Sequence, residues 1–416
     1  MKPNFRYKRA ALVIGMTGLV VFILVRCSGK DNKEQPYADA RKFENYTGPE
    51  KCGTCHKEIY ENHIRTAHYL TGQPAIDKFL KGSFDDGTNV FHYTPDLQVR
   101  MEKRDSGYYQ HIFYQGEDKM SLRFDIVIGS GVMGQSYLNW RNGRLFQMPI
   151  TFFTAANQWS TSPGFPEKRV MIDRPITSRC LECHACFAQG VGGTEMEPES
   201  FDPQKIIYGV TCEKCHGPGA MHVKFHEENP GEKKGKYITN PAALSRIQQL
   251  DACALCHSGK WEKSKPSFSF KPGDKLTDYF VPKEFDDKAL SANDAEVHGN
   301  QYGLLHASQC FKNSDMTCNT CHNTHVNQRG ATEMFSSRCI TCHDTKADNF
   351  RTPAHRQATN IQKNCIDCHM PLRPSNIITV KLEDQDKNVA SLIRSHYIAI
   401  YPDSVLKYTH LNKSSQ

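Results

Sequence analysis

The sequence predicts a mainly α-helical and irregular fold, with one small antiparallel β-module inserted into it. Two observations predict this architecture. The pentapeptide Cys-x-x-Cys-His occurs seven times in 416 residues: once near residue 52, three times between 180 and 257, and three times between 318 and 369. The long gap between the first two pentapeptides is different, because apolar and polar residues alternate there as they do in β-strands.

Each pentapeptide is the attachment sequence of a c-type haem, in which two thiols bond to the vinyl groups and the adjacent imidazole ligates the iron. The seven sets are Cys52, Cys55 and His56; Cys180, Cys183 and His184; Cys212, Cys215 and His216; Cys253, Cys256 and His257; Cys318, Cys321 and His322; Cys339, Cys342 and His343; and Cys365, Cys368 and His369. Structural zinc sites need two such pairs, and a thioredoxin-like motif needs a βαβ setting. Seven pairs leave one over, and no βαβ pattern surrounds them. We therefore expect seven covalently attached haem c groups, stacked and wrapped by short helices.

The composition agrees with an interior that is partly haem. Hydrophobic residues are 38% of the chain, which is low for a globular protein of this size, and apolar porphyrin plates would supply the difference. The formal net charge is +7, but two propionates per haem would bring the assembled protein near neutral or acidic. Lys and Arg are scattered without a basic stripe, so we expect no nucleic-acid partner.

Residues 1–26 have the features of a signal peptide or anchor, because basic residues precede the apolar run 10–25. Cys27 follows and resembles the acylation site of bacterial lipoproteins, with Leu24 in the lipobox position, although Arg26 replaces the usual small residue. The alternative is an uncleaved anchor, slightly short for a membrane span. Both alternatives predict export to the periplasm or cell surface and a membrane tether.

Two cysteines are left after the haem motifs and the lipid candidate are counted. Seventeen cysteines in an exported chain would otherwise suggest a disulfide scaffold. The remaining pair, Cys186 and Cys310, could form one disulfide or stay as two unpaired thiols, and the sequence leaves both alternatives open.

The motif clusters suggest how the chain is divided. We expect a signal peptide or anchor at 1–26, a tether at 27–47, the first haem segment at 48–83, a β-rich insertion at 84–175, haems 2–4 at 176–300, haems 5–7 at 301–375, and a C-terminal strand and helix at 376–416. Within the insertion, residues 107–114 are a predicted strand that turns at 115–118. The Asn-Gly pair at 142–143 predicts a two-residue hairpin.

The C-terminal region is predicted to continue with an extended piece at 377–382. A last helix is then expected to carry Val389, Leu392, Ile393 and His396.

The second axial ligand of each iron decides between electron carrier and catalyst, because only an open position can take a substrate. Nineteen histidines include seven in the motifs, so 12 are left for seven irons and full bis-His ligation is possible. We expect five distal ligands: His68, His222, His306, His325 and His355. His298 and His396 are alternatives, His63 and His226 each lie within five residues of a better candidate, and His92, His111 and His410 are expected to be ordinary strand or tail residues.

Position in the chain supports three of these choices. His325 follows His322 by one helical turn and should point to a neighbouring haem. A Gly-Pro-Gly turn precedes His222 and would bring the chain back over a haem. His68 is predicted on a helix that also carries Tyr60 and Ile64.

The run from Cys52 to His68 resembles the opening haem helix of bacterial multihaem cytochromes of the c-552/4 type, relatives of the tetrahaem partner cytochrome of hydroxylamine oxidoreductase. Residues 212–222, 318–325 and 368–371 are similar to other blocks of that family. The chain departs from the family at His63, where an aromatic residue is usual, and in the β-module, which only a subset carries. The resemblance implies closely stacked, mostly bis-His haems that act as an electron conduit. Catalytic relatives usually carry eight haems, sometimes with a Lys proximal ligand, and neither feature occurs here.

These observations favour an extracytoplasmic electron-transfer protein without a catalytic residue of its own. Its expected partners are redox donor and acceptor proteins, including a membrane respiratory complex. The alternative is an oxidoreductase that acts on a small nitrogen or sulfur compound at one open haem. A third hypothesis, compatible with the first, is a structural subunit whose β-module docks a larger respiratory complex.

Overall fold

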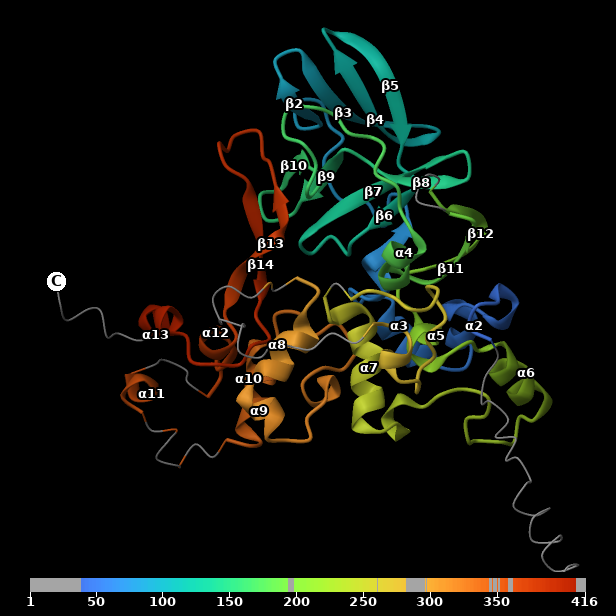
Figure 1. Ribbon diagram of the computed structural model, residues 1–416, viewed down its shortest axis with the longest axis vertical. Helices are drawn as coiled ribbons and strands as arrows, with labels where there is room; N and C mark the ends of the chain where they lie inside the picture. Colours follow the sequence, from blue (N-terminus) through green and yellow to red (C-terminus); the bar gives the residue numbers. More distant parts are fainter. Residues whose placement is uncertain are drawn as a thin grey trace, which may run out of the picture.

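The computed structural model describes residues 39–408 except 194–197, 260, 282–295, 297, 344, 345, 347–349, 351 and 358–361. The signal or anchor segment, Cys27 and His410 lie outside the described residues. In Figure 1 a β-rich part stands above a part of short helices that carries the Cys-x-x-Cys-His motifs. No helix within the described ranges is long and apolar enough to cross a membrane.

The helical part consists of short helices joined by irregular chain. Its α-helices are α2 (Pro49–Gly53), α3 (Lys57–His63), α4 (Ser178–His184), α5 (Cys212–His216), α6 (Ala220–Glu228), α7 (Arg246–His257), α8 (Gln301–Ala307), α9 (Gln309–Lys312), α10 (Thr332–Ile340), α11 (Pro353–Gln357), α12 (Ile366–His369) and α13 (Pro402–Tyr408). The 3₁₀ turns are η1 (Phe43–Asn45), η2 (Tyr69–Thr71), η3 (Pro241–Ala243), η4 (Leu276–Asp278) and η5 (Cys318–Thr320). Isolated helices shorter than about 12–15 residues are marginal in water, so these helices depend on what they pack around.

The β-rich part contains two antiparallel sheets that share one core. The first has the order β1-β6-β7-β9-β10, with β8 paired to β7, and the second has the order β2-β3-β4-β5. Their bounds are β1 (Gly72–Pro74), β2 (Val90–Thr94), β3 (Leu97–Arg104), β4 (Gly107–Tyr114), β5 (Glu117–Arg123), β6 (Ile126–Ile128), β7 (Gly134–Arg141), β8 (Arg144–Gln147), β9 (Ile150–Phe153) and β10 (Gln158–Thr161). Met101, Phe124 and Tyr137 are buried in the core between them.

Both predicted hairpins of the insertion are confirmed. β4 turns into β5 at Gln115-Gly116, and β7 turns into β8 at Asn142-Gly143. Asn142 and Gly143 have φ of 50° and 74°, the left-handed conformation that a type I′ hairpin needs and that this residue pair adopts readily.

The expectation of a mainly α-helical and irregular fold is confirmed only in part, because the fold is mixed. Two further antiparallel pairs lie outside the insertion: β11 (Ala185–Val191) with β12 (Ser200–Tyr208), and β13 (Leu372–Val380) with β14 (Val389–Arg394). The predicted helix over Val389–His396 is wrong, since Val389–Arg394 is strand β14. A short apolar run does not distinguish strand from helix by period alone, and here pairing with β13 decides it.

The hairpin of β13 and β14 rises beside the β-rich part in Figure 1 and packs against it. Phe153 of the first sheet is buried against Val380 and Leu382. The Lys381 amide donates to Thr161 Oγ1 at 3.0 Å, and the Thr161 amide donates to the Lys381 carbonyl at 3.1 Å. Because β13 begins three residues after His369, this contact joins the β-rich part to the last motif.

We predict that Leu382→Ala loosens this contact and lowers the free energy of unfolding by about 2–5 kcal/mol, the usual effect of removing a buried leucine side chain. Leu406→Ala is the matched control, because Leu406 is 46% exposed whereas Leu382 is 4% exposed. Its effect should stay within about 0.5 kcal/mol. Urea denaturation followed by tryptophan fluorescence measures both, and equal losses in the two variants would contradict the packing role.

Candidate haem-binding site

Each motif forms a helical turn that places its first cysteine and its histidine on one face. The amide of the histidine donates to the carbonyl of the first cysteine four residues earlier, at 2.9 Å for His56, His322 and His343 and at 3.0 Å for His369. Residues four apart on a helix lie one above the other. The local backbone therefore presents a thiol and an imidazole toward the same space.

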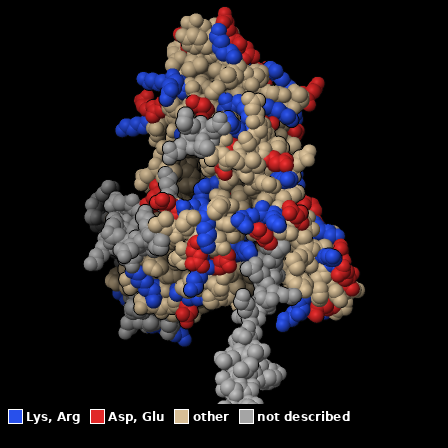
Figure 2. Space-filling model, turned by 45° about the vertical axis from the view of Figure 1, so that its right-hand side comes forward, with Lys and Arg blue, Asp and Glu red and all other residues tan. Residues whose placement is uncertain are grey.

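One large cavity connects the motifs. Its volume is about 3360 Å³, and the cysteines and histidines of the first six motifs line it, with Ile366 and Met370 beside the seventh. Pockets for drug-sized ligands are about 300–1,000 Å³, and protein interiors are otherwise close-packed. A space of this size among short helices fits several large planar groups. Figure 2 shows the surface hollowed below the β-rich end, on a face where basic and acidic side chains are interspersed.

Four pairs of imidazole rings have the separation that a shared metal requires. The ring centres of His68 and His257, of His216 and His325, and of His322 and His396 are each 6.2 Å apart, and those of His355 and His369 are 6.0 Å apart. A metal–imidazole bond is about 2.0–2.1 Å long and the ring centre lies about 1 Å behind its nitrogen, so two rings on one metal are about 6 Å apart. In every pair one ring belongs to a haem motif.

The second nitrogen of most of these rings is held by a hydrogen bond. The Nδ1 atoms of His216 and His369 lie 2.9 Å from the carbonyls of Thr239 and Ala399, and His257 Nδ1 lies 2.9 Å from Gln301 Oε1. Such contacts fix the ring and leave Nε2 for a metal.

Burial keeps the imidazoles of His68 and His396, which pair with motif histidines, in the neutral form. Burial, followed by the charge of His257, lowers the pKa of His68 to about 4. Burial, followed by His322, lowers the pKa of His396 to about 4. A neutral imidazole is the form that binds a metal.

The histidines of the first, second and sixth motifs have no such ring pair among the residues described. His222 lies near His56: its Nδ1 contacts the Lys236 carbonyl at 2.8 Å, and burial together with His226 and His56 lowers its pKa. His298 lies near His184, whose pKa burial and His298 lower. His222 therefore approaches the first motif; the Gly-Pro-Gly turn predicted a return over a haem without indicating which one.

The other candidate histidines are placed elsewhere. His306 has the rings of Tyr302 and Phe311 as neighbours, 6.0 and 5.8 Å away. Both ring nitrogens of His63 lie within 3.3 Å of backbone carbonyls, and His226 lies beside His222. His92 and His111 are strand residues of the β-rich part.

One expectation about a single residue needs correction: His68 does not lie on a helix with Tyr60 and Ile64, because α3 ends at His63. His396, an alternative ligand in the sequence analysis, forms a ring pair with His322. The β13–β14 hairpin brings it there, and no local sequence signal marks that return.

The motifs also contact one another through their cysteines. Four thiol pairs from different motifs are close enough that each thiol shifts the pKa of the other: Cys52 and Cys212, Cys183 and Cys256, Cys253 and Cys318, and Cys339 and Cys365. The elements that carry them pack together accordingly, α2 on α5, α4 on α7, α7 on η5 and α10 on α12. Cys186 and Cys310 are both free thiols in the structure, so the disulfide considered for them does not form there.

Comparison with known proteins finds similarity to one protein family over a short segment and to several longer proteins. The family described as cytochrome c554 and c-prime matches residues 151–217. The multiheme cytochrome MtrA of Shewanella baltica is 28% identical over 46% of this chain and 45% of its own length. The dissimilatory sulfite reductase MccA of Wolinella succinogenes is 21% identical over 82% of this chain and 53% of its own. The chain thus spans about half the length of these relatives.

A further sequence relative and a solved structure are also similar to this chain. Cytochrome c-554 of Nitrosomonas europaea is 25% identical over 33% of this chain and 59% of its own length. The crystal structure of outer cell wall cytochrome OcwA is similar in fold, with a TM-score of 0.51 and 18% identity over 88% of this chain and 82% of that one.

We predict that His396→Ala adds one high-spin ferric haem to the electron paramagnetic resonance spectrum, because the iron at His322 would lose its second imidazole. His63→Ala is the control, since both nitrogens of His63 face carbonyls. That variant should leave the high-spin signal unchanged. An unchanged spectrum for His396→Ala would refute the pairing with His322.

Proposed function

We propose that this chain, a bacterial multihaem cytochrome c, carries electrons outside the cytoplasm through seven covalently attached, mostly bis-His haems. The observation that carries the proposal is the set of four imidazole pairs at a separation of 6.0–6.2 Å. An iron with two imidazoles has no position for a substrate, so those four sites are suited to electron transfer alone.

Different residues have different roles at each site. The motif cysteines attach the porphyrin, the motif histidine holds the iron, and a histidine from another segment completes its coordination. Each bound haem supplies a one-electron Fe(III)/Fe(II) couple. The backbone carbonyls and the Gln301 amide that contact Nδ1 atoms orient the rings and make them stronger ligands.

The contacts between motifs suggest which sites are neighbours. The thiol pairs link the first site to the third, the second to the fourth, the fourth to the fifth, and the sixth to the seventh. His68, from the segment after the first motif, pairs with His257 of the fourth, and His325, beside the fifth motif, pairs with His216 of the third. We propose that these links keep neighbouring haems within electron-transfer distance.

Export and tethering complete the proposal. The basic and apolar N-terminal segment would direct the chain across the membrane, and Cys27 or an uncleaved anchor would hold it there. Redox donor and acceptor proteins, including a membrane respiratory complex, are the proposed partners, and the β-rich part is the proposed docking element.

The second candidate function is an oxidoreductase acting on a small sulfur or nitrogen compound. Two observations favour it. MccA, which aligns with 82% of this chain, is named as a dissimilatory sulfite reductase. The motif histidines His56, His184 and His343 have no ring pair among the described residues, so one of their irons could keep an open position.

The two candidates are separated by measurements on the purified mature protein. Electron transfer predicts a mass that exceeds the polypeptide by seven haems, low-spin ferric signals, and no spectral change with cyanide, sulfite or nitrite. One high-spin iron, together with turnover of sulfite, nitrite or hydroxylamine when an artificial electron donor is supplied, would instead favour the oxidoreductase. A mass without added haem would refute both.

A further inference from the structure

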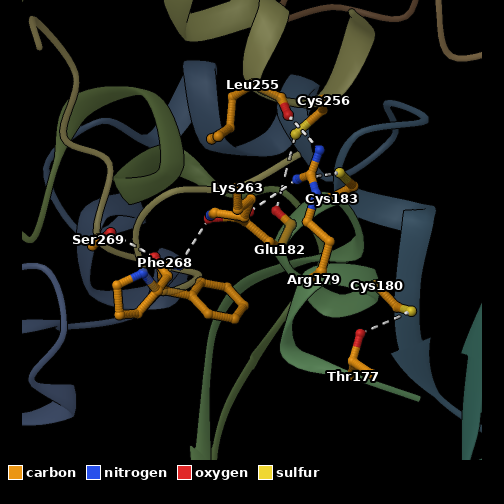
Figure 3. Close-up of polar contacts among 11 residues, drawn as sticks. Thr177, Arg179, Cys180, Glu182, Cys183, Leu255, Cys256, Lys263, Phe268 and Ser269 are labelled. Carbon is orange, nitrogen blue, oxygen red and sulfur yellow. Dashed lines mark hydrogen bonds and ion pairs between the residues drawn. The ribbon is translucent and has the colours of Figure 1, made fainter. Parts of the chain in front are cut away.

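A buried carboxylate lies inside the second motif. Glu182, between Cys180 and Cys183, is fully buried. Both of its carboxylate oxygens accept from Lys263 Nζ at 2.7 Å, one accepts from the Phe268 amide at 2.7 Å, and the other accepts from Arg179 Nη1 at 2.9 Å. Figure 3 shows these groups converging on Glu182. With four such contacts the carboxylate is held in its charged form.

Cations outnumber the carboxylate in this cluster. Lys263 and Arg179 both lie over the ring of Phe280, at 5.1 and 5.2 Å from its centre. Lys214 of the third motif lies over the ring of Phe268 at 4.6 Å and acts on Glu182 through its charge. Three cations therefore surround one anion, and aromatic faces hold them in place.

Another buried motif carboxylate shows that cations are not required for burial. Glu213 of the third motif is 3% exposed, and within the described part of the chain it accepts hydrogen bonds only from the backbone amides of Thr47, Gly48 and Gly219. Backbone donors are enough to satisfy that group. The cations around Glu182 are therefore not needed merely to satisfy its hydrogen bonds, and they add positive charge to the site.

The cluster lies where the second and fourth motifs meet. Arg179 donates to Cys183 Sγ at 3.5 Å and to the Leu255 carbonyl at 3.3 Å, and Cys256 Sγ contacts the Glu182 carbonyl at 3.9 Å. Cys183 and Cys256, one from each motif, face each other across this point. In the haem protein both sulfur atoms carry thioether bonds, so the charges lie beside two attachment points.

We propose that Glu182, Arg179 and Lys263 form a positioning and tuning cluster that sets the reduction potentials of the haems at the second and fourth motifs. This inference rests on the proposed haem content and electron-transfer function. Reduction makes a haem less positive, so a net positive charge in a poorly solvated site favours the reduced form. The cations raise the two potentials, and Glu182 limits that rise.

Opposite charge changes test the proposal. Glu182→Gln removes the anion and keeps the shape, so the potentials of one or two haems should shift upward. Lys263→Met removes a cation and should shift the same haems downward. Potentiometric titration followed by visible absorption measures both, with the potentials of the other haems unchanged. A merely structural role would not reverse the sign between the two variants.

Lys103→Met is the matched control, because Lys103 forms an exposed ion pair with Asp77 in the β-rich part. The potentiometric titration of this variant should match that of the wild type. Shifts of the same sign in both test variants, or titrations that overlay the wild type, would overturn the proposal. If Glu182→Gln loses haem by mass, Lys263→Met decides alone through its downward shift or lack of one. Failure of the proposed function would instead appear in the wild type, as missing haem mass.

Discussion

The separation of two imidazole rings is the constraint on which the proposed haem sites depend, because two rings can share one iron only when their centres are about 6 Å apart. In each of the four pairs the motif supplies one ring by local helical geometry, and the other ring comes from elsewhere in the chain. His68 reaches His257 across 189 residues and His396 reaches His322 across 74. The helices are too short to be stable alone. In the proposed haem protein, long-range imidazole pairing on bound haems would therefore hold these short helices together.

The β-rich part contrasts with this arrangement because it has an ordinary core. Phe91, Met101, Tyr137 and Trp159 pack between its two sheets without any contribution from a motif. It contacts the rest of the chain at two places. Ile126, Leu138 and Leu145 of its first sheet are buried against Leu181 of the second motif and against the β11–β12 pair, and Phe153 meets Val380 and Leu382 of the β13–β14 hairpin. The β-rich part thus has a core of protein side chains and is joined to the motif-bearing part on two sides.

Features with a local cause were predictable from the sequence. The seven motifs and the Asn142-Gly143 hairpin each depend on a few adjacent residues, and the resemblance to multihaem cytochromes follows from the motifs. The pairing of His396 with His322 was not predictable, because it depends on a strand that short apolar periodicity could not distinguish from a helix. The position of His222 near His56 was not predictable for another reason. The Gly-Pro-Gly turn indicates that the chain reverses direction, but it does not indicate which haem the chain then approaches. The mixed character of the fold was underestimated because β11 to β14 are stabilised by pairing rather than by a distinctive pattern.

The residues between the two cysteines of a motif carry no attachment chemistry, so their variation is free to serve contacts between sites. Glu213 uses this freedom to accept the amides of Thr47 and Gly48 at the start of α2, which joins the third motif to the first. Glu182 uses it to bind Lys263, in the segment after the fourth motif, and Arg179, which also donates to the Leu255 carbonyl inside that motif. Lys214, next to Glu213, contributes its charge to Glu182 rather than to its own neighbour. Seven attachment sequences with the same cysteines and histidine can therefore acquire different neighbours and different electrostatic surroundings, which is what a chain of haems needs if its potentials are to differ.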